Sequence, residues 1–235
     1  MTRITNRQLD DLSKRRLAIY AFPPSELADL IQAKMDSVFD SNASLGDTRD
    51  IIGGASLYPP HITIKGAFRL LGNSSADRLE SALHLSKALE RLAATTGVLT
   101  LRTNKLESYP EKSLSIMFDD PSIMRLRELQ ALVIPIVDEV RAQIIEPNYQ
   151  ASAEDETLLK HGEPQTGVKF IPHITVVGGK PGGISSPNQL ERVRELLGED
   201  WYDDWTFDVD KIGLLYETRF NGCWEMHEHF PLQRS

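Results

Sequence analysis

The chain has 235 residues, of which 40% are hydrophobic and 26% are charged, and its net charge is −8. This composition is typical of a globular protein that buries a sizeable core. The acidic balance argues against duplex nucleic acid as a partner, because duplex binders present a broad basic face. Cys223 is the single cysteine, which excludes an intramolecular disulfide. The segment before Arg16 lacks the apolar region of a signal peptide, so we expect a cytoplasmic or nuclear protein without membrane association. We also expect a monomer.

Strands and helices are predicted to alternate through the first half of the chain. Short β-branched or aromatic runs indicate strands, and apolar residues at three- and four-residue spacing indicate helices. Ser25 follows two prolines and is typical of a helix N-cap. His84 lies on a predicted helix and is interpreted as a surface histidine. The expected order is a strand at 17–22, a helix from Ser25, a strand from His61, a helix from Ser74 or Ser75 to Gly97, and strands at 98–106 and 113–118.

The second half is predicted to repeat this organisation. A long helix is expected over 122–145, where Pro135 should kink or divide it. The polar stretch 146–169 is either a functional loop or a surface excursion, and the sequence favours neither. Ser186 and Pro187 are typical of a helix start, and Gly198 of its end. The remaining strands are expected at 205–209, 211–216 and 223–230.

A tetrapeptide pattern occurs twice and organises the whole chain. The copies read His61-Ile62-Thr63-Ile64 and His173-Ile174-Thr175-Val176, and a proline precedes each. Because strand side chains alternate between faces, the histidine and threonine of each copy share one face while the aliphatic residues point into a core. The repeat predicts two related lobes that face each other across a cleft. The alternative is a pair of ordinary core strands with incidental histidines.

These two motifs resemble those of the 2H phosphoesterases, a family named for paired His-hydrophobic-Thr/Ser-hydrophobic sequences. The resemblance implies an α+β fold with two pseudo-symmetric lobes, in which mostly antiparallel sheets line a central cleft and helices lie outside. We therefore expect one bilobal domain over 1–235, with halves at roughly 17–120 and 121–235. It also implies that His61 and His173 are catalytic and that Thr63 and Thr175 bind the substrate phosphate.

Paired imidazoles suit the hydrolysis of a phosphodiester. An unperturbed histidine pKa is about 6.5, so one ring can be neutral and the other protonated near neutral pH, as a general base and a general acid require. Threonine hydroxyls on the same faces can donate to the nonbridging oxygens as charge builds on phosphorus. This scheme needs no metal and no cofactor. The pair His227 and His229 is a possible metal site, but the sequence completes no ligand set around it.

Further residues are candidates for substrate binding. Lys65 is expected on the face of His61, where it would place a cation near the phosphate, unless it is a solvated lysine at the strand end. Aromatic side chains could stack a base at the mouth of the cleft. The candidates, each of which could equally serve packing, are Tyr20, Phe22, Tyr109 and Tyr216.

The resemblance predicts a metal-independent phosphodiesterase that converts a 2′,3′-cyclic nucleotide or an RNA 2′,3′-cyclic phosphate end to a 2′-phosphate. The family also contains proteins resembling 2′-5′ RNA ligases, RNA 3′-end exonucleases, 2′-5′ oligoadenylate phosphodiesterases and ADP-ribose cyclic-phosphate hydrolases, and these alternatives stay open. The low net basicity favours a mononucleotide or a short RNA end as the substrate. A non-catalytic nucleotide-binding module is an alternative of a different class.

Overall fold

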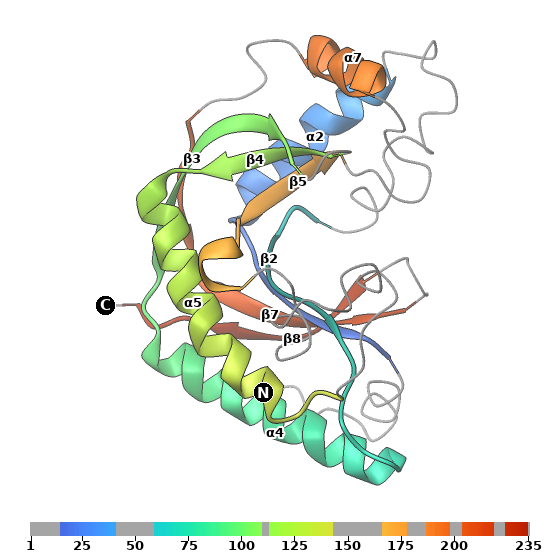
Figure 1. The fold of residues 1–235 in the computed structure, drawn as a ribbon. Coiled ribbons are helices and arrows are strands. Elements are labelled where there is room, and N and C mark those ends of the chain that lie inside the picture. The colour runs from blue at the N-terminus through green and yellow to red at the C-terminus, as the bar shows by residue number, and fades with distance from the viewer. Residues whose placement is uncertain are drawn as a thin grey trace.

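In the described part of the chain, a computed structural model has eight strands that form a single antiparallel sheet (Figure 1). The structure describes residues 15–40, 59–109, 113–142, 166–177, 187–197, 204–218 and 224–234. Within these residues the strands are β1 (Leu17–Ala21), β2 (Ile62–Phe68), β3 (Leu99–Ser108), β4 (Leu114–Phe118), β5 (His173–Val177), β6 (Thr206–Val209), β7 (Lys211–Glu217) and β8 (Trp224–Pro231). All of the strands that the sequence predicted are present.

The strand order differs from the expected division of the chain. The order is β6-β3-β4-β5-β2-β1-β7-β8, and the two motif strands β5 and β2 are neighbours at its centre. One half of the sheet therefore contains β3 to β6, while the other contains β1 and β2 together with β7 and β8. The expected separate sheets are one continuous, curled sheet, and its halves are interleaved in sequence rather than divided near residue 120.

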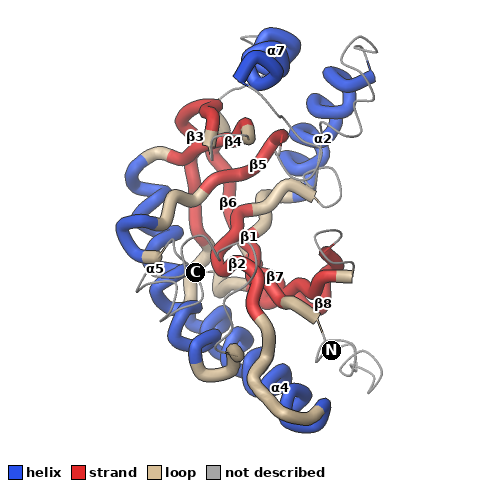
Figure 2. Tube along the Cα trace, turned by 45° about the vertical axis from the view of Figure 1, so that its right-hand side comes forward, coloured by secondary structure: helices blue, strands red, loops and turns tan. Residues whose placement is uncertain are grey.

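The helices are α2 (Ser25–Asp40), α4 (Ser75–Thr95), α5 (Asp120–Asp138) and α7 (Pro187–Leu197), and a short 3₁₀ turn, η4, covers Gly167–Lys169. Helices α4 and α5 pack against each other and lie outside the sheet (Figure 2). Helices α2 and α7 also contact each other, and each contributes side chains to the main core. The expected α+β class is confirmed.

Local signals in the sequence explain where these helices begin and end. Ser74 caps α4 by a reciprocal capping box with Asp77, which satisfies backbone donors that the first helical turn leaves open. Asp119 caps α5 by accepting from the backbone N–H of Ser122, and the helix begins at Asp120, two residues before the expected start. The helix α5 continues for three residues past Pro135, so the proline sits in its last turn. Most of the 146–169 stretch, together with Ser186 and Gly198, lies outside the described residues.

The main core lies on one face of the sheet. Ile62, Ile64, Ile174 and Val176 are completely buried in it, which confirms the inward prediction for both motifs. Helices α4 and α5 complete this core with apolar residues such as Leu85, Leu89 and Val133. Fully burying an aliphatic side chain contributes about 1.5–3 kcal/mol. Because the aliphatic residues of both motifs face this core, their histidines and threonines occupy the opposite face of the sheet.

Candidate active site

Direct pairing of the two motif strands builds the candidate site. Ile62 of β2 pairs with Ile174 of β5 in antiparallel orientation. In an antiparallel ladder the next residues on either side are also level with each other, which places His61 opposite Thr175 and Thr63 opposite His173. Each histidine thus has the threonine of the other motif beside it. The sheet face that carries these four side chains is called the histidine face.

Both imidazoles are held by the same local hydrogen bond. Nδ1 of His61 lies 3.1 Å from the carbonyl oxygen of Pro59, and Nδ1 of His173 lies 2.9 Å from that of Ile171. A carbonyl oxygen only accepts, so each Nδ1 carries a proton and donates. In the neutral ring, Nε2 is then the basic nitrogen. A proline follows the accepting residue in both motifs and holds that residue in an extended conformation, so the sequence repeat produces a geometric repeat.

Burial lowers the pKa of both histidines. The pKa of His61 falls from 6.5 to about 4, chiefly because burial disfavours the charged ring, while the hydrogen bond to Pro59 opposes this shift. The positive charge of His173 lowers the pKa of His61 further. The pKa of His173 is lowered by burial and raised in part by its hydrogen bond to Ile171. Burial thus favours the neutral form of both rings in the free protein.

Two tyrosines predicted from the sequence contact the histidines directly. The Tyr20 ring stacks on His61 with a centroid distance of 3.9 Å and an interplanar angle of 18°. The Tyr109 ring lies edge-on to His173 at 5.1 Å and 76°. One ring face of Tyr20 is thus occupied by His61 itself, so Tyr20 orients the imidazole. Phe22 is buried, and its ring centroid lies 6.3 Å from that of Tyr20.

Comparison with solved structures identifies the architecture. E. coli LigT in complex with 3′-AMP is 12% identical, with a TM-score of 0.53 over 93% of this chain and 98% of that one. LigT in complex with NADP+ gives 0.51 at the same identity and coverage. TT0787 of Thermus thermophilus gives 0.53 at 14% identity, over 94% of this chain and 99% of that one. No family model matches the sequence, and no curated protein is significantly similar in sequence. The chain has the fold of LigT and TT0787.

Two residues depart from the alternation expected for the 2H motifs. Lys65 pairs with Ile19 of the core, whereas Thr63 pairs with Tyr20 of the histidine face, because the β1–β2 register shifts between Ile19 and Tyr20. Lys65 is completely buried: its Nζ donates to the Gly66 carbonyl at 3.3 Å and lies 5.5 Å from the Phe68 ring. The expectation that Lys65 faces the phosphate, and the alternative of a solvated lysine, are both wrong.

Val177 behaves in the same way in the second motif. Strict alternation would place Val177 on the face of His173, but it is fully buried in the core next to Val176. The cause is the register shift between Leu114 and Ser115, the β4 residues that pair with Val177 and Thr175. The β1–β2 pairing and the β4–β5 pairing thus both shift register just after the motif threonine. The polar part of each motif is therefore limited to its histidine and threonine.

Tyr216 is not part of the histidine face. It packs against the main core, pairs with Leu17, and donates its hydroxyl hydrogen to Glu225 at 2.7 Å. Its neighbour Leu215 instead joins Tyr20 and Phe22 in a second apolar cluster, with Trp224 packed against it. The sequence prediction for Tyr216 was wrong by one position, because strand periodicity alone does not give the phase of β7.

Two residues near the histidines were missed from sequence. The ring centroid of Trp224 lies 6.2 Å from that of Tyr20. Because Trp224 lies at the start of a predicted strand, the sequence did not indicate which face of the sheet its side chain occupies. Ser115 is fully buried, pairs with Thr175, and donates its hydroxyl hydrogen to the Tyr109 carbonyl at 2.6 Å. It holds the segment that presents Tyr109 to His173. The alternation of Leu114, Ser115 and Ile116 is a sequence signal that could have found Ser115.

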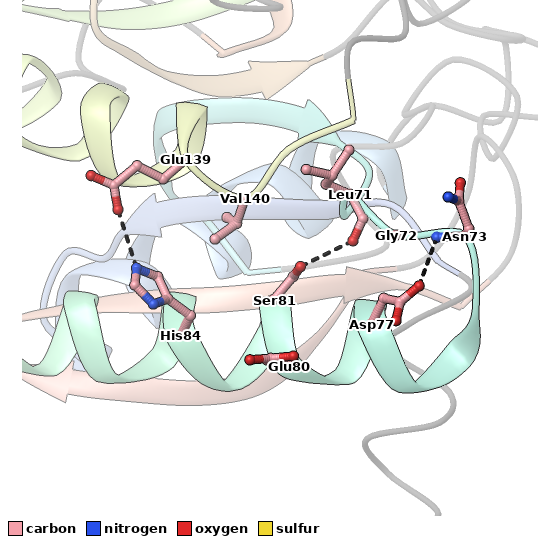
Figure 3. Close-up of a pocket in the computed structure, with 9 residues that line it drawn as sticks. All are labelled: Leu71, Gly72, Asn73, Asp77, Glu80, Ser81, His84, Glu139 and Val140. Carbon is pink, nitrogen blue, oxygen red and sulfur yellow. Dashed lines mark hydrogen bonds and ion pairs between the residues drawn. The ribbon is translucent and has the colours of Figure 1, made fainter.

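Other histidines lie apart from the paired motifs. His84 and Glu139 line an open pocket of about 630 Å³ between α4 and the end of α5, and their side chains point toward each other, 3.1 Å apart (Figure 3). No motif residue lines this pocket, and His84 is half-exposed, which confirms its prediction as a surface histidine. His227 lies edge-on to Tyr216 at 6.4 Å. Within the described part of the chain, no three potential ligands cluster around a metal position.

No helix in the described ranges is long and apolar enough to cross a membrane.

Proposed function

We propose that this chain is a phosphodiesterase that opens a 2′,3′-cyclic phosphate, on a nucleotide or at an RNA 3′ end, to give a 2′-phosphate. The observation that carries the proposal is the Ile62–Ile174 pairing, because it joins both His-x-Thr motifs on one sheet face. The fold supports a phosphodiesterase, and LigT structures with 3′-AMP and NADP+ support a nucleotide as the ligand. The proposal requires neither a metal nor a cofactor.

The proposed reaction divides the proton transfers between two imidazoles. The neutral histidine takes a proton from water at Nε2 while the water oxygen forms a bond to phosphorus. The bond from phosphorus to the 3′ oxygen breaks, and the protonated histidine gives its Nε2 proton to that oxygen. Thr63 and Thr175 donate hydrogen bonds to the nonbridging oxygens, whose negative charge grows in the transition state. The product carries its phosphate on the 2′ oxygen.

A substrate panel with chelator present tests the proposal. The purified protein is expected to convert 2′,3′-cyclic mononucleotides to 2′-phosphates in EDTA, since imidazoles and hydroxyls supply the whole scheme. Turnover confined to RNA 3′ ends, 2′-5′ oligoadenylate or ADP-ribose cyclic phosphate would favour the corresponding alternative reaction. Saturable nucleotide binding without turnover of any substrate would favour the binding module. Loss of activity in EDTA that a divalent ion restores would contradict the metal-independent reaction.

The lowered histidine pKa values predict an acid-shifted pH profile. A rate that needs one neutral and one protonated histidine follows a bell between the two apparent pKa values of the pair. Burial lowers the pKa of both rings below 6.5 in the free protein, so kcat/KM is expected to be maximal below pH 6.5. A bound phosphate raises both pKa values, so the kcat profile should lie at higher pH. Steady-state kinetics across pH checks this, and a kcat/KM maximum above pH 7 would contradict it.

A further inference from the structure

The two halves of the histidine face differ in chemistry. Beside His61, the β1–β7 half presents an apolar cluster of Ala18, Tyr20, Phe22 and Leu215, with Trp224 packed against it. The charged pair at its edge, Arg16 and Glu217, is buried and joined by two side-chain hydrogen bonds. On the other side of the motif strands, β3 carries an exposed ion pair between Lys105 and Glu107.

Strand pairing places Lys105 and Glu107 on the histidine face. Lys105 of β3 pairs with Met117 of β4, and Met117 pairs in turn with His173. Glu107 is aligned in the same way, through Ser115, with Thr175. Leu106 lies between them in sequence and packs against the core, so the flanking side chains point to the opposite face. Strands lie about 4.8 Å apart, so β3 is about 10 Å from β5.

Lys105 is held in place but is still accessible. Its Nζ lies 2.9 Å from Oε2 of Glu107, and the two side chains are 55% and 45% exposed. An exposed ion pair contributes only about 0–1 kcal/mol, so an incoming anion can replace the carboxylate at little cost. A lysine ammonium on its flexible four-carbon stem is a mobile point charge of the kind that contacts phosphates. The fully buried Lys65 cannot take this role without structural change.

We propose that Lys105 binds the phosphate next to the reacting one in a single-stranded nucleotide chain, and that Glu107 competes with that phosphate for Lys105. This inference rests on the proposed function, because it assumes a phosphorus atom bound between the two motifs. The nucleotide chain runs from the paired histidines across β4 to β3, over the polar half of the face. A substrate with at least two phosphates is therefore preferred over a mononucleotide. Lys105 is a specificity residue rather than a proton-transfer group.

The specificity ratio tests this assignment. It is kcat/KM for a dinucleotide ending in a 2′,3′-cyclic phosphate divided by kcat/KM for the cyclic mononucleotide. Lys105→Gln is expected to lower this ratio about five- to tenfold, since it removes a phosphate contact. Glu107→Gln should raise the ratio about two- to fivefold, because the competing carboxylate becomes neutral. Lys87→Gln, which makes the same charge change on the exposed side of α4, is the matched control and should leave the ratio unchanged.

Binding of the product chains separates this inference from the proposed reaction. With the phosphorylated dinucleotide as the probe, Lys105→Gln should make the slope of log Kd against log salt less steep by about 0.7, the value for one phosphate contact on a single strand. Equal ratios and equal slopes in wild type and Lys105→Gln would overturn the inference while the proposed hydrolysis stands. A protein without turnover that still loses dinucleotide affinity in Lys105→Gln would overturn the proposed reaction and retain the phosphate contact.

Discussion

Replacing His61 or His173 with alanine is expected to lower turnover of a 2′,3′-cyclic nucleotide by about a hundredfold or more, the usual contribution of a positioned acid or base. Each imidazole is fixed by an Nδ1–H hydrogen bond to a carbonyl two residues earlier, so its Nε2 has a defined direction. The double variant should be little worse than either single variant, because the two groups act in one step. Measurement of kcat for the four proteins checks this.

A matched activity control and a test of folding accompany these variants. His84→Ala removes a half-exposed histidine of α4 whose partner, Glu139, is the C-cap of α5, and should retain full activity. The free energy of unfolding also depends on the charge of His61. The unfolded chain protonates this ring near pH 6.5, whereas the folded chain protonates it only near pH 4. Stability therefore falls as pH drops through this window, and His61→Ala should lose less stability there than wild type. Near-normal turnover in either single variant would remove the two-histidine mechanism.

The sequence repeat predicted which motif residues face the core and which share the opposite face, because its signals are local. A proline, a histidine and a β-branched strand determine, within five residues, both the face of each imidazole and its carbonyl acceptor. The same kind of local signal placed the start of α4 at Ser74 or Ser75. These features follow from the backbone geometry of one segment. They could be derived without knowing which strands pair.

Features that depend on pairing between distant segments could not be derived in this way. Alternation assumes a regular pleat, and the register shifts beside Thr63 and Thr175 turn Lys65 and Val177 into the core. The pairing of β7 with β1 likewise decides which β7 residues point to the histidine face, and it places Tyr216 on the opposite face. The pairing of β6 with β3, which interleaves the halves of the sheet, also joins segments about a hundred residues apart. Lys105 became a candidate only when two successive pairings aligned it with His173.

Removing the hydroxyl from Thr63 or Thr175 is expected to lower turnover by about a hundred- to a thousandfold, the usual loss of one donor to a developing oxyanion. Valine keeps the β-branched shape, and both threonines are only half-buried, so stability should stay level or rise slightly. Serine keeps the donor, and Thr→Ser variants should retain most activity. Thr100→Val is the matched control, because Thr100 is an exposed threonine near the start of β3 and donates to Asp208 of β6.

The alternative reading, in which the motifs are ordinary core strands, predicts the reverse ranking. Without a phosphate to receive the hydroxyl hydrogen, valine would be harmless or stabilising, and serine would lower the melting temperature because it removes a methyl group from the packed strand. The antiparallel register opposes that reading, since it places Thr63 level with His173 and Thr175 level with His61. Cyclic-phosphate hydrolysis and thermal unfolding of the same variants separate the two. Fully active Thr63→Val and Thr175→Val proteins would exclude the threonines as phosphate donors.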